Sequence, residues 1–165
     1  QCKIAWGRRE GGHIPTNDRI QIGSRKDYIL HALEARFLDD SGFGSRAATK
    51  NFLKEIEAFD PEVIHLHNLH GYYINIDYLF GFLAESKKKI IWTLHDCWPI
   101  TGHCAHFDYV NCSKWQTKCS SCPLLKHYPK SYFYDRSGIN FEVKKCQRGK
   151  IEQANWNNKQ KCMLE

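Results

Sequence analysis

Histidine residues follow two apolar segments of this chain, at the points where each segment ends. His67 follows Val63–Leu66, and His95-Asp96 follows the segment Lys89–Leu94. A histidine at the end of a buried strand can position a hydroxyl group, stabilise developing charge or transfer a proton. Asp96 could orient His95 or cap a following turn. The competing interpretation is that His95 is satisfied by neighbouring backbone groups, and the residues alone leave both open.

The turn after the first segment, His67-Asn68-Leu69-His70-Gly71, adds further polar groups. His65 and His67 alternate, so they share one face of the strand. Together with His70 they could hold zinc, but His65 would then have to reach out of the sheet. We therefore prefer an arrangement in which His65 is packed and hydrogen-bonded. His67, Asn68 and His70 would line a rim, beside the space that Gly71 leaves for a ligand.

Eight cysteines occur in the chain, and five lie in the loop 97–123. Cys104, Cys112, Cys119 and Cys122 include one Cys-x-x-Cys pair, a spacing that lets one turn supply two ligands to tetrahedral zinc. A structural zinc ion would explain how a long loop of low apolar content stays ordered. His103 and His106 are alternative ligands. Reduced, packed thiols and a redox pair at Cys119 and Cys122 are the competing interpretations.

The periodicity predicts an α/β fold that positions these groups. Residues 19–23 alternate as a short strand, and Ile29, Leu30, Leu33 and Phe37 recur at helical spacing after Asp27, a possible cap. A second helix begins near Ser45, with the buried stripe Ala48, Phe52, Ile56 and Phe59, and ends at Asp60-Pro61. A third helix, from about Asn75, links the two apolar segments into a βαβ unit with parallel strands. The carboxyl ends of parallel strands share one edge of the sheet, so we expect His67 and His95 on the same rim.

Length and composition limit the number of domains, the compartment and the kinds of partner that this chain can have. A chain of 165 residues favours one domain, and 42% apolar with 13% aromatic residues excludes a disordered chain. No apolar run is long enough to span a bilayer and no signal peptide is recognisable, which favours the cytoplasm. The net charge of +6 favours anionic partners without choosing among nucleic acid, phosphorylated substrates and an acidic membrane. The chain begins with Gln1, which suggests processing or a fragment.

Several of these motifs, in this order, resemble the amino-terminal domain of bacterial family 4 glycosyltransferases, in particular those that build capsular and exopolysaccharides of the colanic-acid type. The resemblance extends over about residues 4–145 and rests on residues 61–73, Trp92–Trp98, Thr101–Cys104 and Cys119–Pro123. It implies a GT-B enzyme with two Rossmann-like domains. Its amino-terminal domain would hold a glycan or lipid-linked acceptor, and its carboxyl-terminal domain would bind the nucleotide-sugar donor. Transfer would retain the anomeric configuration without a catalytic metal.

By this resemblance His95 is the active-site histidine, with Asp96 beside it, and residues 67–71 face the acceptor. We expect residues 1–145 to form an incomplete Rossmann-like domain that is inactive alone and contacts the inner face of the membrane. Residues 146–165 depart from the family pattern, which predicts a disordered or out-of-frame tail. The alternative is a zinc-stabilised module that binds nucleic acid or protein through Lys114, Trp115 and Lys118. Under the glycosyltransferase interpretation no nucleic acid is bound.

Overall fold

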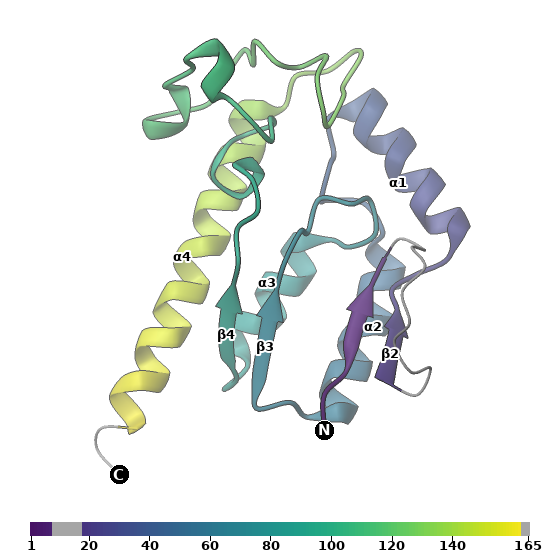
Figure 1. Ribbon diagram of the computed structural model, residues 1–165, viewed down its shortest axis with the longest axis vertical. Coiled ribbons are helices and arrows are strands. Elements are labelled where there is room, and N and C mark those ends of the chain that lie inside the picture. The colour runs from purple at the N-terminus through teal and green to yellow at the C-terminus, as the bar shows by residue number, and fades with distance from the viewer. Residues whose placement is uncertain (8–17, 163–165) are drawn as a thin grey trace.

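The chain forms an α/β structure built on two small parallel sheets. The computed structural model describes residues 1–7 and 18–162. Strand β1 (Ile4–Trp6) pairs with β2 (Arg19–Gln21), and β3 (Val63–Leu66) pairs with β4 (Lys89–Trp92), with Val63 opposite Lys89. All four strands point the same way in Figure 1. The predicted α/β class and the predicted strands in residues 19–23, 63–66 and 89–94 are confirmed, although β2 and β4 end earlier than expected.

The β3–α3–β4 unit forms the centre of the structure. Helix α3 (Ile76–Glu85) begins after Asn75, whose side chain accepts a hydrogen bond from the backbone N–H of Tyr78. The helix buries Ile76, Leu79, Phe80 and Leu83, and these join Leu66 and Ile90 of the strands in the main core. Apolar residues at helical spacing are expected to dock on a sheet in this way. The predicted βαβ unit with parallel strands is confirmed.

Helix α1 (Arg25–Leu38) is present where it was predicted, but Ser24 is its cap. Ser24 and Asp27 form a capping box, in which each side chain bonds the backbone N–H of the other residue. The helix buries His31, Ala32 and Ala35, whereas the apolar residues that predicted it are exposed: Ile29, Leu30, Leu33 and Phe37. Small side chains let α1 approach its neighbours closely. His31 is held there because its Nε2 accepts hydrogen bonds from the backbone of Gly42 and Gly44.

Helix α2 (Arg46–Phe59) follows the prediction more closely. Ala48 and Ile56 are buried, while Phe52 packs against the main core and Phe59 is half-buried. Ser45 precedes the helix in the left-handed region at φ 49°, and Asp60 ends it at φ 50°. Asp60 donates its backbone N–H to the carbonyl of Ile56, which closes the last turn. The Asp60-Pro61 stop therefore lies where the sequence predicted it.

Helix α4 (Ser137–Cys162) corrects the prediction of a disordered tail from Cys146. Ile151 is only 7% exposed and belongs to the main core, Gln147 donates to Asp77, and Arg148 donates to the carbonyl of Pro99. The apolar periodicity was hidden because the buried positions of this helix include the polar residues Lys144 and Gln147. Residues 163–165 of the predicted tail lie outside the described residues.

Residues 97–123 connect β4 to the approach of α4 without long regular elements. The segment contains the short 3₁₀ helices η2 (Trp98–Ile100), η3 (Asp108–Val110) and η4 (Lys114–Gln116). Trp98 is 1% exposed and anchors the segment in the core. It packs so close to Gly42, which adopts φ +84°, that a Cβ there would lie 2.6 Å from the indole. In the described part of the chain, no helix combines the length and apolar character needed to cross a membrane.

Candidate functional site

The structure brings His67 and His95 into direct contact at the carboxyl edge of β3 and β4. The Nδ1 of His67 lies 2.8 Å from the Nε2 of His95, and both side chains are exposed. The contact follows from the register of β3 and β4, because Leu66 pairs with Trp92 and the segments that follow the two strands leave the sheet side by side. The predicted position of the two histidines on one rim is confirmed.

The two imidazoles share a hydrogen bond, so one ring donates and the other accepts. Desolvation lowers the pKa of His67, and the neighbouring His65 and His95 lower it further. The His65 ring contacts the His67 ring at an angle of 38°, with centroids 4.2 Å apart, and the Nε2 of His65 bonds the hydroxyl of Thr93 at 2.8 Å. The hydrogen bond predicted for His65 is present, but the ring is exposed, because its side of the strand is uncovered. The neutral form of His67 is therefore favoured, and a neutral imidazole offers one donor and one acceptor.

His70 lies behind this rim, which corrects its predicted place on the rim. It is 7% exposed, with Nε2 2.6 Å from the Asp96 carboxylate and Nδ1 3.1 Å from the Tyr128 hydroxyl. Asp96 also accepts the backbone N–H of Trp98. Burial raises the pKa of Asp96, but the bonds from His70 and Trp98 outweigh it and leave the pKa below its ordinary value. Asp96 therefore orients His70 and caps the turn at η2, and its hydrogen bonds do not include His95.

Aromatic residues support the loop between β3 and α3. The carbonyl of Asn68 accepts the hydroxyl of Tyr73 at 2.5 Å, and the carbonyl of His67 accepts the indole N–H of Trp92 at 3.2 Å. A Cβ on Gly71 would lie 2.9 Å from the Tyr73 ring, so the glycine permits this aromatic contact. The backbone at residues 67–71 is thus fixed, while the Asn68 side chain is exposed.

The four predicted zinc ligands line one small cavity. Cys104, Cys112, Cys119 and Cys122 all contribute to its wall, and none forms a disulfide. The Cys122 thiol hydrogen-bonds Cys104 and lowers the pKa of Cys104 to about 6. Cys97 does not line this cavity; it is half-buried and donates its backbone N–H to Ala105. His106 is exposed.

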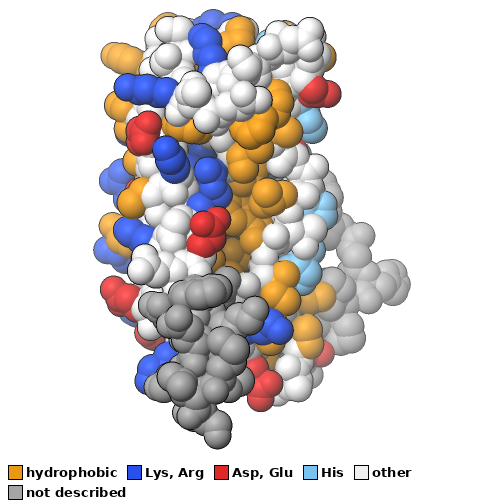
Figure 2. Space-filling model, turned by 90° about the vertical axis from the view of Figure 1, so that its left-hand side faces the viewer, with side chains coloured by type: hydrophobic (Ala, Val, Ile, Leu, Met, Phe, Trp, Pro, Cys, Tyr) orange, Lys and Arg blue, Asp and Glu red, His pale blue; other side chains and the backbone are white. Residues whose placement is uncertain are grey.

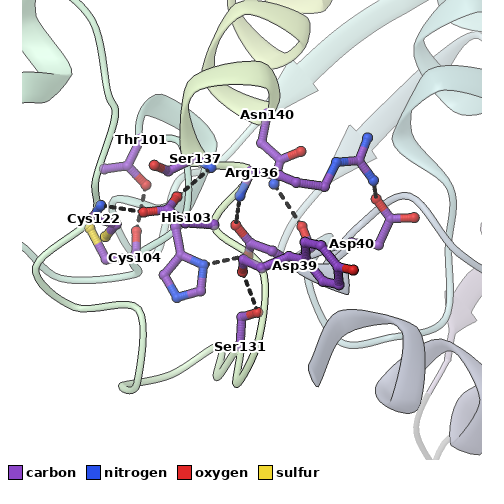
Figure 3. Close-up of polar contacts among 12 residues, drawn as sticks. Asp39, Asp40, Thr101, His103, Cys104, Cys122, Ser131, Arg136, Ser137 and Asn140 are labelled. Atoms are coloured by element: carbon purple, nitrogen blue, oxygen red, sulfur yellow. Dashed lines mark hydrogen bonds and ion pairs between the residues drawn. The ribbon is translucent and has the colours of Figure 1, made fainter. Parts of the chain in front are cut away.

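A buried polar cluster centred on Asp39 was not found from the sequence. Asp39 Oδ1 lies 2.5 Å from His103 Nδ1, and Oδ2 accepts the backbone N–H of Arg136 at 2.8 Å. The backbone carbonyl of Asp39 accepts the Asn140 side chain (Figure 3). Asp39 ends α1 at φ 56°, so the cluster joins α1 to the cysteine loop and to the start of α4. The sequence did not reveal this cluster, because its members lie up to 101 positions apart and because Asp39-Asp40 is typical of an ordinary helix end.

Comparison with known proteins gives one similarity. A stretch of 74 residues is 40% identical to the "Putative colanic acid biosynthesis glycosyl transferase WcaC" of Escherichia coli (strain K12). The match covers 42% of this chain and 18% of that protein, so the chain spans well under half of its relative. It confirms the similarity to colanic-acid-type glycosyltransferases that the motifs indicated. No protein-family model matches the chain, and no solved structure matches it.

Proposed function

We propose that this chain is the acceptor-side part of a retaining glycosyltransferase. It would take part in moving a sugar from a nucleotide-sugar donor to a polysaccharide or lipid-linked acceptor, with the donor bound by a second Rossmann-like domain. The incomplete Rossmann-like assignment is part of the proposal, and it is supported by parallel βαβ topology and by the similarity to WcaC.

The contact between His67 and His95 carries the proposal. Polar groups at the carboxyl ends of parallel strands are where open α/β sheets bind ligands. The hydrogen bond between the rings holds His95 in a defined orientation and leaves each imidazole a second nitrogen for a sugar hydroxyl or a developing charge. Under this proposal His95 contacts the transferred sugar, and His67 and Asn68 contact the acceptor. His70 and Asp96 act as positioning residues beneath them.

The surface beside this edge is compatible with a membrane-linked acceptor. Figure 2 looks onto the side where α4 and β4 lie, and it shows a band of hydrophobic side chains with Lys and Arg, interspersed with Asp and Glu, on one side and His on the other. On and after β4, Ile91 and Leu94 are 41% and 48% exposed. Basic and apolar side chains together favour an anionic membrane surface. We include peripheral contact with the inner face of the membrane in the proposal.

Titration of the histidine rings by NMR tests the proposal on this chain. With ¹⁵N-labelled imidazoles, an oligosaccharide acceptor from the corresponding polysaccharide is expected to shift the His95 and His67 signals. The nucleotide sugar alone should leave them unchanged, because its binding residues are proposed to lie in the other domain. His67→Ala should weaken acceptor binding, whereas His127→Ala, an exposed histidine elsewhere, should not. Acceptor binding that is equally strong in both variants would contradict the proposal.

The nucleic-acid- or protein-binding alternative has weaker support. Lys114, one of its three residues, donates its amino group to the carbonyls of Ser120 and Ser121, so it serves the loop itself. Trp115 likewise stacks on Phe107, with ring centroids 5.1 Å apart. Retention on a heparin column that falls steeply with salt would favour this alternative.

A further inference from the structure

We propose that Cys104, Cys112, Cys119 and Cys122 bind one structural zinc ion, with His103 as a positioning residue beside it. All four thiols line one cavity of about 10 Å³. A cavity of this size holds at most about one water-sized sphere, which also suits a single metal ion. The inference is independent of the proposed glycosyl transfer.

The histidine next to these thiols gives a second indication of an occupant. His103 also lines the cavity, and its side chain is only 1% exposed. Its Nδ1 is held by the Asp39 carboxylate, but its Nε2 is buried without a hydrogen-bond partner among the described residues. Buried polar nitrogens are rarely left unpaired. With the ring protonated on both nitrogens, Nε2–H could donate to a zinc-bound thiolate while Nδ1–H donates to the Asp39 carboxylate, which would fix the ring as carboxylates fix imidazoles near metals.

The loop around the thiols is already organised. The Lys114 amino group donates to the carbonyls of Ser120 and Ser121 at 2.8 and 3.0 Å, which ties η4 to the Cys-x-x-Cys turn. The backbone N–H of Cys122 donates to Asp135 at 2.7 Å, immediately before α4. Cys104 and Cys119 are buried, and Cys112 and Cys122 are half-buried. The backbone thus brings the thiols together from separate turns.

Metal binding would require the thiols to turn toward a common point. In residues 1–7 and 18–162, no group of three or more His, Cys, Asp or Glu side chains is already arranged to hold a metal ion. On binding, each thiol would release its proton to solvent and coordinate as a thiolate, giving a zinc tetrathiolate with two net negative charges. Four protein ligands leave no open position, so the ion would be structural. Zinc would then hold the loop that immediately precedes the segment with Tyr128, whose hydroxyl bonds His70.

Metal analysis of the full chain tests this inference. The chain purified from zinc-supplemented cells, without a metal-binding tag, is expected to contain about one zinc per chain. Cobalt added to zinc-free chain should give sulfur-to-cobalt charge transfer and strong visible bands of tetrahedral coordination. Cys119→Ser should lose the zinc and weaken these bands, whereas the matched control Cys97→Ser should keep both. His103→Gln should keep tetrahedral cobalt and bind it more weakly.

Four results would overturn the inference. The first is unmodified chain that retains no zinc and gives no tetrahedral cobalt spectrum, a result that does not depend on any variant folding. The second is a disulfide between Cys104 and Cys122 in intact protein handled under reducing conditions. The third is equal zinc loss in Cys97→Ser and Cys119→Ser. The fourth is a Cys112→Ser variant that keeps its zinc while His103→Gln loses it, which would replace the four-cysteine site with one ligated by His103.

Discussion

Replacement of Asp39 by alanine should be among the most damaging substitutions at a polar position. The Asp39 side chain is 2% exposed, and its two oxygens serve His103 and the backbone N–H of Arg136 (Figure 3). Asp39→Ala leaves both donors buried without an acceptor. A hydrogen bond to a charged group is worth about 1.5–3 kcal/mol, so the two bonds together are worth about 3–6 kcal/mol. We expect the free energy of unfolding to fall by about 3–6 kcal/mol.

Two matched variants separate charge from geometry in this prediction. Asp39→Asn keeps a side-chain oxygen and tolerates the left-handed backbone, so its loss should be about half as large. The neighbouring Asp40 pairs with Arg136, whose side chain is 39% exposed, so Asp40→Ala should cost about 1 kcal/mol or less. Urea unfolding followed by tryptophan fluorescence measures all three. A loss in Asp39→Ala no larger than that in Asp40→Ala would refute the reasoning.

Two further predictions concern the core and its pH dependence. Ile151→Ala should lower the free energy of unfolding by about 2–4 kcal/mol, because it removes a buried side chain from the core. The control Gln153→Ala, at an exposed position, should change it by less than about 0.5 kcal/mol. Equal, small effects of both variants in urea unfolding would show that this part of α4 does not pack in the core. Burial lowers the pKa of His31 from 6.5 to about 4, so on acidification the unfolded chain takes up a proton that the folded chain does not. Stability contributed by neutral His31 is therefore complete above pH 6.5 and is lost toward pH 4, by about 3 kcal/mol in total. Urea midpoints across this range should fall less steeply in His31→Gln, and an unchanged slope would contradict the assignment.

The sequence predicted best those features that depend on local pattern. The apolar stripe of α3 and the Asp60-Pro61 break delimit the βαβ unit, and parallel pairing then places His67 beside His95. The ends of α1 and α2 and the start of α3 were also recognisable from single residues, although Ser24 rather than Asp27 caps α1. Hydrophobic periodicity and the residues that begin or end a helix are properties of a short stretch of sequence, so they can be recognised without knowledge of the tertiary structure.

The features that were missed depend on contacts between distant residues. The apolar residues of α1 face outward because His31, a polar residue, fills the packing face by accepting two backbone hydrogen bonds from the Gly42–Gly44 corner. Lys144 is completely buried in α4, where it donates to the Trp98 carbonyl and lies 3.9 Å from the centre of the indole ring. A polar residue in a core position interrupts the expected hydrophobic periodicity, and its burial can be understood only once its hydrogen-bonding partner is known. The Asp39–His103 pair was invisible for the same reason.

The chemical roles of the candidate site were only partly predictable. Side-chain order along β3 indicated that His65 and His67 share a face, and their rings are indeed in contact. The sequence could not place His70, because its position depends on Tyr128, which lies 58 residues further along the chain. Asp96 directly follows His95, but adjacent residues near a strand end point in different directions. Asp96 accordingly bonds His70 instead of His95.

The most direct test of the proposed function is sugar transfer in a full-length relative that carries the histidine corresponding to His95. Changing this histidine to alanine is expected to lower kcat by about a hundredfold or more, as loss of an acid–base group or a transition-state hydrogen bond does. Binding of the nucleotide sugar should remain close to normal, because the donor is held by the other domain. A change at the position of exposed His127 should leave transfer intact. Undiminished transfer without the His95 imidazole would contradict the role assigned to the His67–His95 pair.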